Sequence, residues 1–186
     1  SLAAEHDLVA AGALTTSIHE IAVANSNGVF AHHAGTEAEF VTVVMSADSS
    51  GYGFDRANTL AELDVDTVAR RAVDKAVRSR GPRALPAGRY AVVLEPEATS
   101  DLLGSMAYTS FGGLQVEEGS SFLSGRLGES VLAPQVTIID DALSPACLPM
   151  PFDYEGSPKQ RVTVIDRGVA REVVHDSYTA ALAGTQ

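Results

Sequence analysis

The sequence predicts an α+β fold: an antiparallel sheet unit with one long helix, followed by the start of a second, sheet-rich domain. Three observations lead to this prediction. The strand-like run Thr16–Ala24 ends at a tight-turn sequence, Asn25–Gly28, which favours a hairpin. One apolar stripe with helical spacing follows within Thr67–Ser79. Two further strand-like runs, Val136–Ile139 and Arg161–Asp166, occupy the C-terminal third.

The first unit is predicted to contain three short strands. After the Thr16–Ala24 strand and its turn, Val29–His33 forms the returning arm of the hairpin. Glu39–Ala47 is rich in β-branched and bulky residues and is predicted to be a third strand. Asp48–Gly53 combines aspartate, serine and glycine, a composition typical of a flexible turn that closes the unit.

The helix at Thr67–Ser79 has the clearest signals in the chain. Asp66 is predicted to cap its N-terminus through a side-chain oxygen. Arg78 lies where the helix dipole favours a cation, and the pair Gly81-Pro82 cannot continue the helix. Apolar residues at helical spacing form one stripe: Val68, Ala69, Ala72, Val73, Ala76 and Val77.

A domain boundary is predicted between Pro82 and Gly88, where proline, glycine and alanine replace the periodic pattern. Residues 1–83 would form a central domain and residues 87–186 the first part of a C-terminal domain. No internal repeat is visible.

The second domain is predicted to begin with a buried strand at Tyr90–Leu94, followed by a turn at Pro96–Thr99. A helix rich in small residues then covers Ser100–Phe111, packed by the surrounding sheet. Glycines divide the next thirty or so residues into loops and short pieces, and Ser177–Ala183 forms a terminal helix.

Composition excludes several classes of protein. The 186 residues are 45% hydrophobic and 20% charged, which suits a protein with a buried core. A net charge of −11 disfavours direct nucleic-acid binding, and we find no apolar run long enough to span a bilayer. The single cysteine, Cys147, cannot form a disulfide within the chain, so we expect a cytoplasmic location and an inert thiol.

The most informative segment joins the two C-terminal strands and reads Pro151-Phe152-Asp153-Tyr154-Glu155-Gly156-Ser157-Pro158. Asp153 and Glu155 are two residues apart, so in an extended segment both carboxylates would face one side, where they could share a proton or a cation. The alternative is a structural use, in which they accept backbone N–H groups at a tight turn before Gly156. Asp140-Asp141 similarly could bind a cation or cap the turn that follows them.

Other side chains give weaker signals. His32 and His33 are adjacent on a strand and point to opposite faces, so they cannot chelate one metal together. His175-Asp176 could form a local hydrogen bond before the terminal helix. The serines lack the Gly-x-Ser-x-Gly turn of α/β-hydrolases. The residues alone therefore show no complete catalytic constellation.

Four runs together resemble the TldD/PmbA family. They are Ala22–Gly28, Gly88–Pro96, Ser124–Glu129 and Phe152–Gly156, and their order and spacing match that family over essentially the whole chain. The resemblance implies the central part of a longer protein. It also implies a relation to two-subunit zinc metallopeptidases that degrade small or unfolded peptides, and whose members are also called modulators of DNA gyrase.

The resemblance further implies which subunit type this is. In the TldD subunit a helix carries His-Glu-x-x-x-His, whose imidazoles hold zinc while the glutamate handles the proton of the attacking water. The matching positions here are Gly104, Ser105 and Thr109, so neither histidine nor the glutamate is present. This pattern is similar to the PmbA (TldE) subunit. We expect no metal and no catalytic residue in this chain, with zinc supplied by a TldD-type partner subunit.

The expected partners are a TldD-type subunit in a heterodimer, or a second copy in a homodimer, together with a peptide substrate bound as an added strand. Two alternatives are a self-contained peptidase that uses Asp153, Glu155 or Asp140 as acid and base, and a non-enzymatic scaffold or binding protein.

Overall fold

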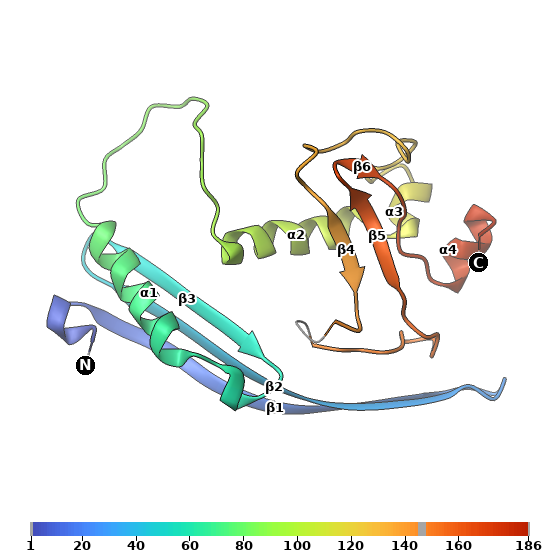
Figure 1. The fold of residues 1–186 in the computed structure, drawn as a ribbon, viewed down its shortest axis with the longest axis horizontal. Helices are drawn as coiled ribbons and strands as arrows, with labels where there is room; N and C mark the ends of the chain where they lie inside the picture. Colours follow the sequence, from blue (N-terminus) through green and yellow to red (C-terminus); the bar gives the residue numbers. More distant parts are fainter. Residues whose placement is uncertain (1, 145–147, 186) are drawn as a thin grey trace. The chain divides into compact units, whose positions relative to one another are not determined.

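The computed structural model describes residues 2–144 and 148–185. Cys147 lies outside the described residues. The chain divides into two compact units. Unit 1 spans the chain as far as Ala91 and takes in a short stretch ending at Pro149, and unit 2 contains the remainder. This arrangement is α+β, as the sequence predicts (Figure 1).

Unit 1 is built on a three-stranded antiparallel sheet. Its strands are β1 (Val9–Ala24), β2 (Phe30–Met45) and β3 (Ser50–Ala57), in the order β1-β2-β3. A short 3₁₀ helix precedes β1 at Ala4–His6, and another follows β3 at Leu60–Glu62. The predicted hairpin joins β1 to β2, and the two 16-residue strands pair along their full length.

The hairpin turn forms because asparagine satisfies its backbone. The Asn25 side-chain oxygen accepts hydrogen bonds from the backbone N–H groups of Asn27, at 2.9 Å, and Val29, at 3.2 Å. Gly28 has a φ of +86°, which glycine adopts without steric cost. These contacts confirm the predicted turn.

Three strand predictions in unit 1 were wrong. The first strand, predicted to begin at Thr16, begins at Val9. The returning arm and the predicted third strand are one continuous strand, because Gly35 and Thr36 stay in register with β1, opposite His19 and Ile18. Of the segment predicted as a closing turn, residues 50–53 instead form the first half of β3, which begins at Ser50.

The glycines of β3 serve helix packing. A Cβ on Gly51 would lie 1.9 Å from the carbonyl oxygen of Ala72, and one on Gly53 would lie 2.8 Å from that of Val68. Glycine at these two positions lets a helix approach the sheet closely. From composition alone, the same glycines indicate a turn.

The helix α1 (Val65–Arg78) packs across β3 and β2 (Figure 1). Its buried residues are the predicted stripe's Val68, Ala72, Val73 and Ala76. Its N-cap is Asp64 rather than the predicted Asp66. Asp64 accepts hydrogen bonds from the Thr67 backbone N–H, at 3.0 Å, and the Thr67 hydroxyl, at 2.6 Å. These bonds lower the pKa of the Asp64 carboxyl.

The strand β1 forms one edge of the sheet. Between Val9 and Ile18 it contains no charged residue and no proline, and nearly all of this stretch is exposed. Its open edge therefore presents backbone N–H and C=O groups beside small and apolar side chains.

Unit 2 combines short helices with a second antiparallel sheet. The helices are α2 (Pro96–Ser110), α3 (Gly113–Glu117) and α4 (Ser177–Ala183), and the strands are β4 (Ile138–Asp141), β5 (Arg161–Asp166) and β6 (Val169–Ala170). The sheet order is β4-β5-β6. The bounds of β5 and α4 match the prediction, whereas β4 begins two residues later than predicted.

The segment that leads into α2 differs from the prediction. The segment predicted as a buried strand, Tyr90–Leu94, is irregular and exposed, with Val93 96% exposed. In the described part of the chain no strand pairs with it, so its apolar composition alone does not produce a strand. The predicted turn Pro96–Thr99 is the first turn of α2, because proline is favoured at the first helical position.

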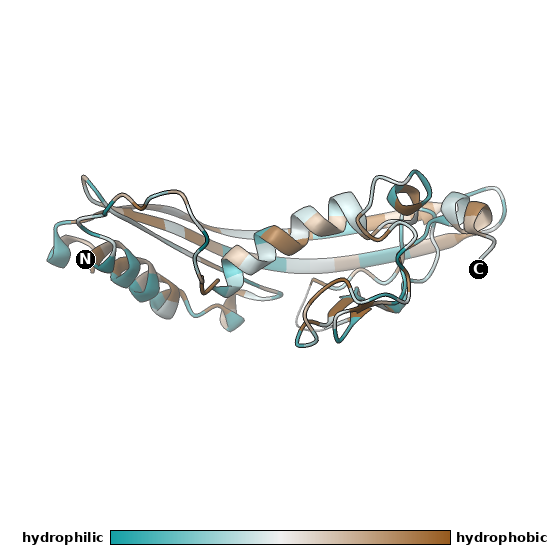
Figure 2. Cartoon of the chain, turned by 90° about the horizontal axis from the view of Figure 1, so that it is seen from above, coloured by the Kyte–Doolittle hydropathy of each residue, from teal (hydrophilic) through white to brown (hydrophobic). Residues whose placement is uncertain are grey.

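The core of unit 2 consists of Phe111, Leu123, Val164, Ile165, Ala170 and Val173. Met106 of α2 packs against this cluster, and Ser110 is the one residue of α2 that is buried. The sheet therefore packs only the C-terminal part of α2, not the whole predicted helix. In Figure 2, α2 shows pale and brown turns, whereas α1 is teal over much of its length.

No helix among residues 2–144 and 148–185 has the length and apolar character needed to cross a bilayer.

Candidate functional site

The three positions that the sequence analysis compared with the zinc motif lie in the C-terminal half of α2. Gly104, Ser105 and Thr109 are all exposed. The Thr109 hydroxyl donates a hydrogen bond to the backbone carbonyl of Ser105, at 2.8 Å. A glycine has no side-chain donor atom, and hydroxyl groups are poor zinc ligands beside imidazole and thiolate. These three side chains therefore offer no zinc-binding set.

The helix geometry adds a second constraint on these positions. Residues five apart, such as Gly104 and Thr109, are rotated by about 140° around a regular α-helix. Two side chains meet on one face at a spacing of three or four, or where a π-type turn widens the helix. Helix α2 is α-helical throughout Pro96–Ser110.

The loop between β4 and β5 is organised by Asp153. One of its carboxylate oxygens accepts hydrogen bonds from the backbone N–H groups of Glu155 and Ser157, both at 2.9 Å. Gly156 follows with a φ of +85°, and its N–H donates to the Asp153 carbonyl. This arrangement matches the structural alternative, in which the carboxylate stabilises a tight turn.

Glu155 joins this loop to the start of α4. Its two carboxylate oxygens accept hydrogen bonds from the Ser177 backbone N–H, at 2.9 Å, and the Ser177 hydroxyl, at 2.6 Å. The first N–H groups of a helix lack partners within the helix, and a carboxylate also interacts favourably with the dipole there. Glu155 therefore bonds the loop between β4 and β5 to the start of α4, which lies 22 residues further along the sequence.

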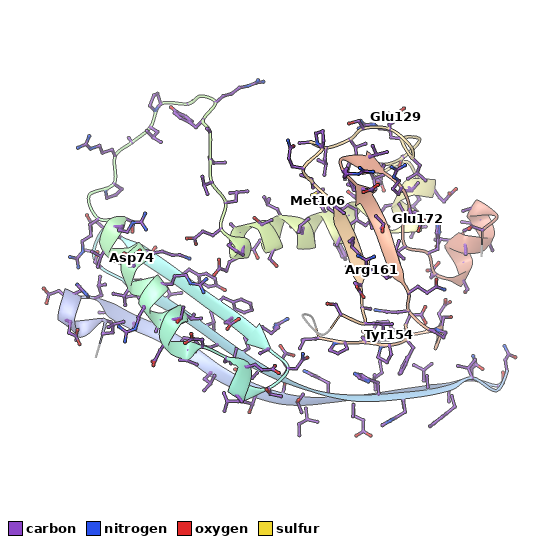
Figure 3. All side chains as sticks on the ribbon, in the orientation of Figure 1. Asp74, Met106, Glu129, Tyr154, Arg161 and Glu172 are labelled. Atoms are coloured by element: carbon purple, nitrogen blue, oxygen red, sulfur yellow. The ribbon has the colours of Figure 1, made fainter. Side chains whose placement is uncertain are left out.

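Tyr154, which is labelled in Figure 3, stands between Asp153 and Glu155 in the sequence. Its side chain is 80% exposed, while the neighbouring Phe152 is buried. The loop therefore holds its backbone fixed and leaves one large aromatic ring on the surface. Such a ring can bury much area against another molecule at little cost in conformational entropy.

The sequence did not reveal Ser177 as the partner of Glu155. The capping box at the start of α4 could have located the helix start, but it does not identify Glu155 as the group that reaches it. Asp176 accepts hydrogen bonds at 2.7 Å from both the backbone N–H and the hydroxyl of Thr179, which lower the pKa of the Asp176 carboxyl. That spacing locates the helix start, where an acceptor is needed.

Two further predictions near this loop have outcomes. The first is the local hydrogen bond predicted for His175 and Asp176. The Asp176 carboxylate instead bonds to Thr179, and the His175 Nδ1 atom is buried without a hydrogen-bond partner among the described residues. Asp141 accepts a bond from the Leu143 N–H, at 3.3 Å, as a turn cap does, and pairs with Arg161 at 3.3 Å (Figure 3).

Within residues 2–144 and 148–185 there is no cluster of three or more histidine, cysteine, aspartate or glutamate side chains that could hold a metal ion. The structure brings Glu155 and Ser177 together from distant parts of the sequence, while Asp153 and Asp176 bond within their own turns.

The fold and these motif positions define a class of protein. The family model for the PmbA/TldA metallopeptidase central domain matches residues 2–80, and that for the C-terminal domain matches residues 87–186. The chain belongs to the PmbA/TldD metallopeptidase family.

Individual relatives agree with this assignment. A metalloprotease of Methanothermobacter thermautotrophicus is 26% identical over 98% of this chain, and the metalloprotease PmbA of Escherichia coli O157:H7 is 27% identical over 86%. A solved structure of a candidate modulator of a DNA gyrase from Thermotoga maritima has a TM-score of 0.81 and 27% identity over 93% of this chain. TldE from Thermococcus kodakarensis has a TM-score of 0.72 at 24% identity over the whole chain, which shows a shared fold.

The chain spans about two fifths of the length of these proteins: 43% and 37% of the two metalloproteases, and 41% and 44% of the two solved chains.

Proposed function

We propose that this chain is the non-metal subunit of a TldD/TldE-type metallopeptidase complex that degrades small or unfolded peptides. The observation that carries the proposal is the side-chain set on α2. Where a zinc-binding helix needs two imidazoles and a glutamate, this helix has Gly104, Ser105 and Thr109.

In this proposal the chain supplies peptide binding and the partner supplies hydrolysis. A TldD-type subunit would hold the zinc and activate the attacking water. The loop centred on Tyr154 would contact the peptide or the partner, since Asp153 and Glu155 fix the loop backbone while the tyrosine ring stays on the surface. The open edge of β1 could receive an extended peptide as an added strand, which gives broad sequence tolerance through main-chain hydrogen bonds.

The decisive experiment compares the complete protein alone with the same protein co-expressed with a TldD-type subunit. We expect the protein alone to contain less than stoichiometric zinc and to cleave no peptide, and the pair to cleave peptides until a chelator is added. Metal analysis and a peptide-cleavage assay provide the two measurements. Stoichiometric zinc with cleavage by the protein alone would overturn the proposal.

The role of the loop has its own test in the co-expressed pair. We expect Tyr154→Ala to raise the KM for peptide, or to weaken subunit association, by about tenfold, because a large aromatic contact is lost. Tyr178→Ala is the matched control, since Tyr178 is also exposed, at 63%, and lies on the neighbouring helix α4. Equal effects of the two substitutions would contradict a specific role for Tyr154.

A further inference from the structure

The sheet of unit 1 has apolar side chains on both of its faces. Antiparallel sheets commonly place apolar side chains on one face and polar side chains on the other. The C-terminal end of β2 does not alternate in this way, because residues 40–45 read Phe-Val-Thr-Val-Val-Met. A strand with this composition is expected to be covered on both sides.

Helix α1 covers one of these two faces. Gly51 and Gly53 lie against α1, and the strand register pairs them with Val44 and Thr42 of β2. All four residues are buried. Because successive side chains of a strand point to opposite faces, the residues that alternate with these four face away from α1.

The side chains that face away from α1 form a second apolar surface, which we call the open face. Two neighbouring rungs of the sheet define it: Ala11, Val43 and Tyr52 in one, and Ala13, Val41 and Phe54 in the next. Val9 and Met45 extend it by one rung. None of these side chains is buried, and Tyr52 is 44% exposed. A contiguous apolar surface of this kind is typical of an interaction site.

Two aromatic rings on β3 are the largest groups of the open face. The rings of Tyr52 and Phe54 stack, with centroids 6.5 Å apart and an interplanar angle of 8°. Arg56 lies over the Phe54 ring, 5.7 Å from its centroid, and pairs with Glu37 at 2.9 Å. These contacts hold the rings in place, and well-held aromatic side chains are strong anchors in protein interfaces.

The dimensions of the open face suit a single helix. Three strands at a spacing of about 4.8 Å give a width of about 14 Å, and the five residues 9–13 give a length of about 17 Å. A helix with its side chains is about 10–12 Å across, and about eleven of its residues span 17 Å. The 14-residue helix α1 packs on the opposite face of the same sheet.

The charge around the open face selects among possible occupants. Residues 1–63, which contain the whole sheet, have eight acidic side chains and one cationic side chain, a net charge of −7 with histidine neutral. A second copy would bring the same negative charge against it, and an anionic membrane or a nucleic acid would also be repelled. A helix with one apolar stripe flanked by lysine or arginine complements both the apolar surface and its acidic surroundings.

We propose that the open face of unit 1 is a docking site for a basic amphipathic helix of a partner protein. The apolar stripe of that helix covers the valines and contacts the two aromatic rings, and its cations lie near Glu37 and Glu39. The site goes beyond the metallopeptidase proposal, because it needs neither zinc nor peptide cleavage. Its small area predicts reversible binding that weakens with added salt.

The test measures binding of a fluorescein-labelled peptide of fourteen leucine and lysine residues, arranged as an amphipathic helix, by fluorescence anisotropy. We expect the parent chain to bind this peptide at least tenfold more tightly than a scrambled peptide of the same composition. Tyr52→Ala should weaken binding at least tenfold, because an aromatic anchor is lost. Leu14→Ala is the matched control and should bind as the parent does, since Leu14 is 52% exposed on the α1 side of the same sheet.

A second measurement locates the peptide without any substitution. In methyl NMR spectra of the parent chain, the peptide should shift the signals of Val41 and Val43 more than those of Val68, which is buried beneath α1. Circular dichroism shows whether each variant remains folded. Should Tyr52→Ala unfold, the NMR result decides the outcome.

Several outcomes would overturn the proposal. The parent could fail to bind the peptide, the scrambled peptide could bind equally well, or Leu14→Ala could lose as much affinity as Tyr52→Ala. Tighter binding of a leucine–glutamate peptide of the same pattern would contradict a basic occupant. A dimer in sedimentation that Tyr52→Ala abolishes would identify a second copy instead, and binding to phosphatidylcholine vesicles that the same variant loses would identify a membrane.

Discussion

The helices α1 and α2 differ by one residue in length, but α1 buries its apolar side chains and α2 leaves several of them exposed. Helix α1 buries one apolar stripe against β2 and β3, and its exposed face is charged. Helix α2 exposes Leu102, Leu103 and Tyr108 at 54%, 36% and 84%. An amphipathic stripe thus finds a partner within its own unit, whereas a helix with apolar residues around its circumference is only partly covered here.

The sharpest test of this contrast uses glycine. Gly51→Ala in β3 should destabilise the chain by about 3 kcal/mol, because the new Cβ would lie 1.9 Å from the Ala72 carbonyl oxygen and force α1 away. Gly104→Ala in α2 should stabilise it by about 1 kcal/mol, since nothing beyond the adjacent residues and the helix's own nearby backbone lies within 4 Å of the new Cβ, and alanine favours a helix. Urea unfolding measures both changes. If both substitutions changed the free energy of unfolding in the same direction, the contrast between the two helices would be contradicted.

A second pair of substitutions removes apolar atoms from each helix. Val68→Ala should cost about 2 kcal/mol, because Val68 is 2% exposed and its truncation leaves a cavity between α1 and the sheet. Leu102→Ala should change the free energy of unfolding by less than about 0.5 kcal/mol. The same urea experiment decides the outcome, and a large loss for Leu102→Ala would show that α2 is packed in solution.

The smallest expected effect concerns the caps and pH. The Asp64 side chain caps α1 and has a lowered pKa, whereas the N-cap of α2, Glu95, makes no side-chain capping bond. The contribution of Asp64 to stability is therefore present above its ordinary pKa of 3.8 and is lost as the pH falls through the lowered value. Denaturation midpoints at pH 5 and pH 2.5 should differ less in Asp64→Asn than in the parent.

The same contrast explains how far the sequence predicts the fold. Local signals sufficed where local physics decides the structure, as in the Asn25–Gly28 turn, the stripe of α1 and the bounds of β5 and α4. They failed where a distant segment decides it. Gly51 appears as a turn residue until α1 lies against it, and Tyr90–Leu94 has strand composition but no ladder partner in the described part of the chain.

The candidate site follows the same rule. The sequence alone shows that Gly104, Ser105 and Thr109 carry no imidazole, thiolate or carboxylate group. The spacing of Asp153 and Glu155 allowed either a shared proton or a structural turn, and only the fold brings Ser177 to Glu155. Contacts across 22 residues depend on how β5 returns the chain, and no local pattern encodes that.

The uncharged edge of β1 has a practical consequence for work with this chain. Sheet proteins commonly guard such edges with lysine or proline to prevent growth into fibres, and Val9–Ile18 contains neither. Concentrated samples will therefore be prone to aggregation through edge-to-edge assembly. One gatekeeper lysine in place of Ala11 is the simplest means of keeping them in solution.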